Sequence, residues 1–326
     1  MNDLMKKLLT VKSLKKYFPI YGGLLSRVMG QVKAVDDVSF DIYEGEILGL
    51  VGESGCGKTT VGRMTLRLME PTSGNVYFEG EDIFALKRKE LAKFRPKMQI
   101  IFQDPYSSLN PRFTVERIIG EAISVHLNIT GKQLREKVES LMEKVGLSPL
   151  YINRYPHEFS GGQRQRIGIA RALSLGPSYI ICDEPVSALD VSIQAQIINL
   201  LQSLQEQENL SMLFISHDLS VVKHLAQRTA VMYLGKIVEL ARTDRLSNNS
   251  AHPYTQALLA SQPSLDPKSR DRPPPLTGDV PTPLNPPSGC HFHPRCPKVM
   301  ERCKNEIPRP IQLEEGHQVR CHLYDE

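Results

Sequence analysis

The stretch Gly52-Glu53-Ser54-Gly55-Cys56-Gly57-Lys58-Thr59-Thr60 decides the fold of this 326-residue chain. An apolar run typical of a buried strand, residues 47–51, precedes it, and apolar residues at helical spacing follow it. In such a strand–loop–helix, glycines turn backbone N–H groups toward a phosphate chain, and the helix start adds its dipole. We therefore predict a phosphate loop at residues 52–60 that binds a nucleotide, with Lys58 at the β- and γ-phosphates and Thr59 on Mg²⁺.

The composition excludes several classes of protein. Forty basic and 36 acidic residues give a net charge of +4, too small to indicate a nucleic-acid partner by itself. No apolar run approaches the roughly 20 residues that span a bilayer, and the first ten residues are too short and broken for a signal peptide. We expect a protein kept in the cytoplasm, where its six cysteines stay reduced.

Apolar strands alternate with helices along the chain, which predicts an α/β domain with a largely parallel central sheet. Residues 22–31 have the character of a loop, and 32–42 alternate like a hairpin pair of strands. Residues 104–160 are predicted to be a mainly helical insertion. The remaining predictions are strands at 11–18, 47–51, 75–78, 98–102, 179–183 and 212–215, and helices at 134–145, 164–175 and 193–204.

An acidic pair supplies the second element that a phosphate loop needs. The strand 179–183 would deliver Asp183 beside Mg²⁺, and Glu184 follows it directly. Glu184 is then placed to orient and deprotonate a water for attack on the γ-phosphate. Cys56, in the loop, and Cys182, in the strand, are predicted to be small fillers with no redox role.

Four further stretches carry a resemblance to a known family. Phe159-Ser160-Gly161-Gly162-Gln163 is similar to the signature sequence of ABC-transporter ATPases, and it stands upstream of the strand 179–183 as it does in that family. Gln103 resembles the Q-loop of the family, Ser187-Ala188-Leu189-Asp190 its D-loop, and His217 its switch histidine. The resemblance covers roughly residues 8–260 and is specific, because five motifs, the phosphate loop included, occur in the family's order.

The resemblance implies a P-loop ABC-type nucleotide-binding domain at 1–247, a RecA-like core with an antiparallel β subdomain and a helical subdomain at about 104–160. Gln103 would contact Mg²⁺ and the attacking water, and His217 the γ-phosphate. Phe18 would stack on adenine, with Tyr17 as the alternative one position away. In a head-to-tail dimer the signature would close over the ATP of the other subunit, because a Ser-Gly-Gly stretch opening a helix is itself an anion site. The residues it implies there are Ser160, Gly161, Gly162, Gln163 and Asp190.

Two stretches narrow the resemblance. Residues 103–112 and His252-Pro253-Tyr254-Thr255 resemble the ATPases of peptide and nickel importers, most closely those of the dipeptide/oligopeptide type. This implies a peripheral subunit at the cytoplasmic face of the membrane that hydrolyses ATP to power peptide import. Its partners would be two permease subunits, a second ATPase subunit and, indirectly, an extracytoplasmic peptide-binding protein. A nickel importer, or a soluble ABC ATPase acting on nucleic acid or ribosomes, remains an alternative.

The end of the chain differs in character. A proline-rich linker is predicted at 248–288, followed by a small module at 289–326 that holds Cys290, Cys296, Cys303 and Cys321. A module of this size needs a covalent or metal staple, and the cytoplasm argues against disulfides. The loose spacing, without C-x2-C pairs, favours a [4Fe–4S] cluster over zinc, with free or oxidised thiols as the third alternative. His291, His293 and His322 are predicted to lie at the surface or to support the ligands, although they could serve zinc.

Overall fold

The structure is a computed structural model that describes residues 6–22, 27–261, 278–279 and 281–325. Its chain divides into two compact units that alternate along the sequence. Unit 1 contains Tyr43–Glu46 and Ala85–Ile215, and unit 2 contains Lys7–Ile42, Ile47–Phe84 and Ser216–Glu326. The phosphate loop therefore belongs to unit 2, whereas the acidic pair and the signature belong to unit 1.

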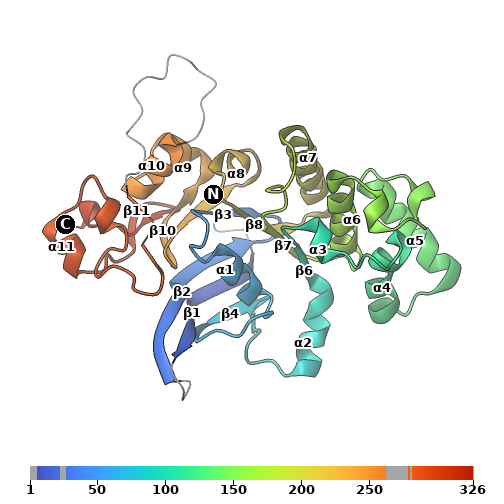
Figure 1. Cartoon of the computed structure of the whole chain (residues 1–326), viewed down its shortest axis with the longest axis horizontal. Coiled ribbons are helices and arrows are strands. Elements are labelled where there is room, and N and C mark those ends of the chain that lie inside the picture. The colour runs from blue at the N-terminus through green and yellow to red at the C-terminus, as the bar shows by residue number, and fades with distance from the viewer. Residues whose placement is uncertain (1–5, 23–26, 262–277, 280, 326) are drawn as a thin grey trace, which may run out of the picture. The chain divides into compact units, whose positions relative to one another are not determined.

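Unit 2 contains two groups of strands. One is a four-stranded sheet in the order β2-β1-β4-β5, whose neighbouring strands β1, β2 and β4 are drawn in blue in Figure 1. In the other, the strands run in the order β11-β12-β10-β9-β3, and only β3 and β9 are parallel. The strands are β1 (Lys7–Gly22), β2 (Arg27–Tyr43), β3 (Ile47–Val51), β4 (Ser73–Phe78), β5 (Glu81–Asp82), β9 (Arg228–Tyr233), β10 (Lys236–Arg242), β11 (Ile311–Glu314) and β12 (His317–Val319).

Short helices complete unit 2. The first, α1, follows the phosphate loop and buries Val61 and Met64 as the helical spacing predicts, but Leu68, the third residue of that spacing, lies beyond the helix and is 52 % exposed. Two 3₁₀ turns, η4 and η5, lie in the C-terminal segment. The helical elements are α1 (Lys58–Thr65), α8 (Leu219–Leu225), α9 (Thr243–Asn248), α10 (Pro253–Ala260), α11 (Glu301–Asn305), η4 (His293–Arg295) and η5 (His322–Tyr324).

Unit 1 has a parallel sheet and a helical region. Its strands run in the order β8-β7-β6, and every residue of β7 and β8 is buried, as expected for strands covered on both faces. The helices α4, α5 and α6 gather together, in green in Figure 1. The elements are α2 (Arg88–Phe94), η1 (Arg95–Lys97), β6 (Met98–Ile101), α3 (Pro105–Ser108), α4 (Val115–Leu127), α5 (Gly131–Lys144), η2 (Pro149–Tyr151), η3 (Pro156–Glu158), α6 (Gly161–Leu173), β7 (Tyr179–Asp183), α7 (Val191–Glu208) and β8 (Ser211–Ser216).

Several sequence predictions need correction. The predicted loop at 22–31 is wrong at residue 22, where β1 ends, and from residue 27 on, where β2 starts, and residues 23–26 lie outside the described ranges. The predicted hairpin at 32–42 is one continuous strand. The sheet is parallel in unit 1 but mostly antiparallel in unit 2. The reason is that β10, β11 and β12 pair with their neighbours in unit 2 in antiparallel fashion, and these strands are not predicted from the sequence.

The C-terminal segment shares the core of unit 2. Strand β12 pairs with β10, placing Val319 opposite Glu239, and Val319 packs with Ala251 and Cys321 in one buried cluster. Helix α10 lies inside the predicted linker 248–288 and buries Tyr254, whereas the proline-rich residues 262–277 and 280 lie outside the described part. The segment 289–326 thus buries apolar residues against the rest of unit 2. Its small size is therefore no reason to expect a disulfide or a metal ion that stabilises it.

Candidate functional site

The phosphate loop has the backbone of an anion-binding turn. Lys58, only 4 % exposed, donates from Nζ to the carbonyl oxygens of Gly52 at 2.7 Å and Glu53 at 3.0 Å. These bonds tie the two ends of the loop together and hold the ammonium group at the start of α1. A positive charge at that place, added to the helix dipole, suits the phosphates of a nucleotide.

Gly57 shows why the loop requires glycine. Its φ of 107° is left-handed, and a Cβ there would lie 2.1 Å from the carbonyl oxygen of Ala34. No residue with a side chain fits without a shift of the backbone. Cys56 is buried beside Lys58, and burial raises the pKa of its thiol, which agrees with a filler role. The other predicted loop residues, Ser54, Gly55, Thr59 and Thr60, lie between or directly after these positions.

The two aromatic candidates for adenine stacking differ in their surroundings. The hydroxyl of Tyr17 donates to Asp36 at 2.5 Å, and Asp36 is also paired with Lys236 at 2.7 Å. Burial and the Asp36 carboxylate raise the pKa of Tyr17. Phe18 is 37 % exposed and has the ammonium of Lys16 5.1 Å from its ring centre. Tyr17 is half-buried and has the ammonium of Lys33 5.7 Å from its ring centre, so Phe18 is the more exposed of the two residues.

His217 stands where a strand ends and a helix begins. It directly follows β8, is exposed, and precedes Asp218, the N-cap residue of α8. The Asp218 carboxylate accepts the N–H of Ser220 at 2.7 Å, which fixes the turn around His217. A histidine at this strand end is presented on a short, well-defined loop.

In unit 1 the structure brings Gln103 and Glu184 together. The Nε2 of Gln103 donates to the carboxylate of Glu184 at 2.9 Å, although 81 residues separate the two. Glu184 has a left-handed φ of 46°, and its N–H donates to Ile215 at 3.1 Å. A glutamate held in this conformation costs of order 1 kcal/mol, a cost that residues at functional sites often carry. Asp183, just before it, is 3 % exposed at the end of β7.

The signature opens α6. Ser160 is its N-cap: its Oγ accepts the N–H of Gln163 at 3.3 Å, and the Gln163 side chain accepts the N–H of Ser160 at 3.0 Å. Helix α6 thus begins at Gly161, three residues before the predicted start at 164. A Cβ on Gly162 would lie 2.5 Å from Ile193, so this glycine lets α6 approach α7 closely. Asp190 is the N-cap residue of α7.

The pKa values of the Cys290, Cys296 and Cys321 thiols respond to the charges of neighbouring C-terminal cysteines. Burial raises the pKa of Cys290 to about 12, and Cys303, Cys321 and Cys296 add to that rise. Cys296 interacts in the same way with Cys303, and Cys321 with both. All four thiols are free.

A metal site at these cysteines is not visible, however. Among the described residues, no group of three or more His, Cys, Asp or Glu side chains is arranged to hold a metal ion. His291 and His322 are buried, which corrects the prediction of surface positions for them. His291 contacts the carbonyl of Leu234 at 3.0 Å, and His322 contacts Asp325 at 2.7 Å. These rings are engaged away from the thiols.

Two family models match the chain. The ABC transporter model matches residues 35–187, and the model of the oligopeptide/dipeptide transporter C-terminal region matches residues 238–303. The oligopeptide transport ATP-binding protein AppF of Bacillus subtilis (strain 168) is 55 % identical over 321 residues, which are 97 % of either chain. The chain belongs to the ATP-binding subunits of the oligopeptide/dipeptide ABC transporter family.

Other family members and solved structures agree. A probable peptide ABC transporter ATP-binding protein, y4tS of Sinorhizobium fredii, is 53 % identical over 97 % of this chain and 90 % of its own. The dimeric ATP-binding cassette MJ0796, in a post-hydrolysis state bound to ADP and Pi, covers 72 % of this chain and 98 % of its own at 27 % identity, with a TM-score of 0.64. The chain therefore has the α/β fold of an ABC nucleotide-binding domain. Within the described ranges, no helix is long and apolar enough to cross a membrane.

The C-terminal region of this family member contacts the phosphate loop, which the sequence patterns do not predict. The N–H of Glu53 donates to the hydroxyl of Tyr254 at 3.0 Å, and the Glu53 carboxylate forms an ion pair with Arg295 at 2.8 Å. Tyr254 belongs to the His252-Pro253-Tyr254 stretch that had only narrowed the resemblance. Tyr254 is fully buried, but no repeating pattern of apolar residues around it in the sequence predicts this, so only the structure reveals it.

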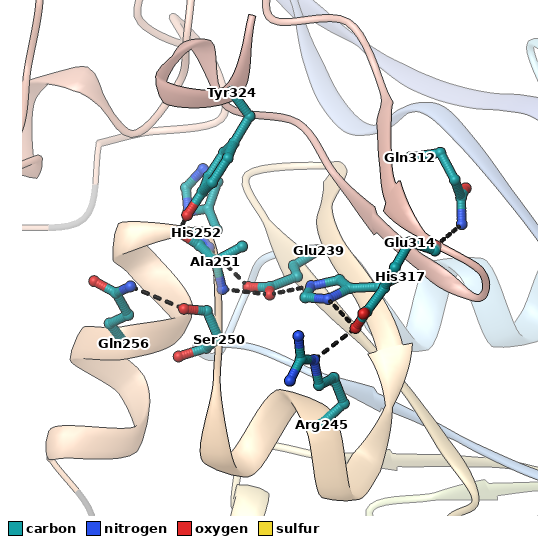
Figure 2. A network of polar contacts seen from close by, with 10 residues as sticks. All are labelled: Glu239, Arg245, Ser250, Ala251, His252, Gln256, Gln312, Glu314, His317 and Tyr324. Carbon is teal, nitrogen blue, oxygen red and sulfur yellow. Dashed lines mark hydrogen bonds and ion pairs between the residues drawn. The ribbon is translucent and has the colours of Figure 1, made fainter.

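A second buried network fixes the same region (Figure 2). Glu239 on β10 is fully buried and accepts hydrogen bonds from the N–H groups of Ala251 at 2.7 Å and His252 at 3.0 Å. His317 on β12 contacts the same carboxylate at 2.9 Å. These contacts join the start of α10 to the C-terminal strand, and because all are buried they hold α10 in one position.

Proposed function

We propose that this chain is the ATP-hydrolysing subunit that powers import of di- and oligopeptides through an ABC permease. The observation that carries the proposal is the match of residues 238–303 to the oligopeptide/dipeptide transporter C-terminal region, in addition to the ABC transporter match. The match to the oligopeptide/dipeptide C-terminal region favours peptide import over nickel import. Both matches together favour a transporter subunit over a soluble ABC ATPase that acts on nucleic acid or ribosomes.

The residues have distinct roles in this proposal. Residues 52–60 bind the phosphates of ATP, with Lys58 at the β- and γ-phosphates and Thr59 on Mg²⁺. Asp183 and Gln103 complete the magnesium site, Glu184 deprotonates the attacking water, and His217 contacts the γ-phosphate. Phe18 is the preferred adenine partner because the residue is more exposed than Tyr17, whose hydroxyl is bonded to Asp36.

The proposal also covers the assembly of this chain with a second ATPase subunit and with the permease. The signature residues 160–163, with Asp190, would close over the ATP of a second ATPase subunit in a head-to-tail dimer, and closure would drive the two permease subunits. The dimeric arrangement named for the MJ0796 cassette supports this. An extracytoplasmic binding protein would deliver the peptide, and the chain would lie at the cytoplasmic face of the membrane. The proposed domains are the nucleotide-binding domain at 1–247, the linker at 248–288 and the C-terminal module at 289–326.

Uptake measurements test the proposed function. Vesicles that contain the chain, its permease subunits and a partner ATPase are expected to accumulate a labelled dipeptide only when ATP is supplied. Omission of the chain should abolish uptake, because ATP-driven closure is what moves the permease. ATP-dependent accumulation of Ni²⁺ with no response to peptides would contradict the peptide assignment.

We further propose that Cys290, Cys296, Cys303 and Cys321 hold a [4Fe–4S] cluster, with zinc as the alternative. The mutual electrostatic influence of the four thiols supports a shared site, although their present arrangement is not a ligand set. Four thiolates satisfy either occupant, and loose spacing favours the wider cluster. A bound cluster would supply one-electron chemistry or added stability.

Metal content tests this assignment. Protein purified without oxygen is expected to contain about four iron and four sulfide per chain and to absorb visible light, because each thiolate binds one iron. Replacement of Cys303 by Ser should lower the iron content, whereas replacement of Cys56 by Ser should not change it. A colourless protein with one zinc and no iron would establish the zinc alternative, and a metal-free protein would reject both.

A further inference from the structure

Glu53 is an acidic residue inside a loop that receives phosphates. ATP brings several negative charges to this loop, and a carboxylate close to them is unfavourable unless a cation compensates it. The Glu53 side chain is 25 % exposed, so water screens it only in part. The position therefore needs an explanation that the phosphate-binding role of the loop does not supply.

Arg295 compensates this carboxylate. Its two terminal nitrogens donate to the two carboxylate oxygens of Glu53 at 2.8 and 3.1 Å, which is a bidentate pair. The Arg295 side chain is 5 % exposed, and the hydrogen bonds to Glu53 raise the pKa of Arg295. The remaining nitrogen, Nε, is buried without a partner, so Glu53 supplies the main anchor of the guanidinium group.

Tyr254 holds the backbone of the same residue. Its hydroxyl accepts the Glu53 N–H at 3.0 Å, so that N–H is directed toward Tyr254 and not toward a phosphate. The Tyr254 ring is fully buried and packs against Tyr233, with ring centres 4.6 Å apart, and Phe292, at 5.4 Å. The backbone of Glu53 is thus hydrogen-bonded to α10 and its side chain to η4, and both elements belong to the C-terminal region.

We propose that Arg295 and Tyr254 are positioning residues for ATP binding, which neutralise Glu53 and fix the start of the phosphate loop. Neither residue needs to touch the nucleotide. Arg295 acts through the Glu53 carboxylate, whose charge it balances, and Tyr254 acts through the Glu53 N–H. The inference rests on the proposed phosphate-binding role of residues 52–60.

The test measures ATP affinity and turnover on the purified full-length chain, with a fluorescent ATP analogue and steady-state hydrolysis. Arg295→Gln is expected to raise the Kd and KM for MgATP about tenfold, with kcat within about twofold, because an uncompensated charge opposes anion binding. The double variant Glu53→Gln with Arg295→Gln should recover affinity to within about threefold of the unmodified chain, since no carboxylate then faces the phosphates.

Arg320→Gln is the matched control. Arg320 also joins the C-terminal segment to a carboxylate of the same unit, Asp37, at 3.0 Å, but it does not contact the phosphate loop. Its loss is expected to leave ATP affinity unchanged. If Arg320→Gln weakened binding as much as Arg295→Gln, or if the double variant recovered nothing, the action of Arg295 through Glu53 would be wrong.

Two further variants cover other outcomes. Should Arg295→Gln fail to fold, Tyr254→Phe keeps the packed ring and removes only the acceptor: affinity lowered about threefold supports the proposal, and unchanged affinity overturns it. Lys58→Ala distinguishes a failure of the phosphate-loop assignment from a failure of the positioning role of Arg295 and Tyr254. If Lys58→Ala binds ATP normally, the assignment of the phosphate loop fails. If it loses ATP while the Arg295 and Tyr254 variants bind normally, only the positioning role fails.

Discussion

Replacement of Glu184 by Gln is expected to lower ATP turnover about 10²- to 10⁴-fold while leaving ATP affinity nearly unchanged, because a general base contributes to the chemical step alone. The substitution is nearly isosteric. The side-chain oxygen of Gln can still accept the hydrogen bond that Gln103 now donates to Glu184 at 2.9 Å, so the local geometry should persist. ATP-bound dimer should accumulate, because closure is retained while its release by hydrolysis is blocked.

Single-turnover hydrolysis and size-exclusion chromatography with MgATP measure these two effects. Glu206→Gln is a suitable control, since Glu206 is an exposed residue of α7 whose carboxylate receives only a 3.4 Å contact from Gln202. It should hydrolyse ATP at the normal rate. If Glu184→Gln did the same, the water would be activated by another group and the assignment would have to be abandoned.

Where the sequence predicts well, the residues leave the chain few choices. The bounds of the strand 179–183 are predicted correctly. All its residues are buried, so it stands out in the sequence as a continuous apolar run. The turn before α1 is equally determined, since the left-handed backbone at Gly57, where a Cβ would clash with Ala34, is available only to glycine. Gln103 is placed near Glu184 only by the resemblance to ABC ATPases, and the two meet because both follow parallel strands, whose carboxyl ends share one edge.

Where the sequence predicts poorly, charged residues occupy buried places. Strand β10 contains Lys236 and Glu239, both buried, and a pattern based on apolar residues passes over it. These charges are tolerated because Asp36 pairs with Lys236, and because His317 and two backbone N–H groups bind Glu239. Asp36 lies 200 positions from Lys236, and His317 lies 78 positions from Glu239. The pairing of Arg295 with Glu53, across 242 positions, is hidden for the same reason.

Replacement of Ser160 by Arg is expected to abolish hydrolysis, by about 10²-fold or more, while ATP binding to the same chain stays within about twofold of normal. Ser160 is exposed at the start of α6, where its oxygen caps the N–H of Gln163 and its O–H can still donate to an anion at the positive end of the helix dipole. In the proposed dimer that anion is the γ-phosphate of ATP on the partner. Arginine at this place removes the small hydroxyl and blocks the approach by its bulk, so the defect should appear only when two chains meet.

The substitution also removes a helix cap, which by itself costs about 1 kcal/mol. Thr114→Ala controls for that loss, because Thr114 caps α4 in the same unit through a 3.4 Å bond to the N–H of Arg117. It should lower thermal stability slightly and leave turnover intact. Binding of a fluorescent ATP analogue, hydrolysis and dimer formation are then compared among the three proteins. A fall in ATP binding as large as the fall in turnover would mean that Ser160 serves the nucleotide of its own chain, and the head-to-tail role of the signature would be wrong.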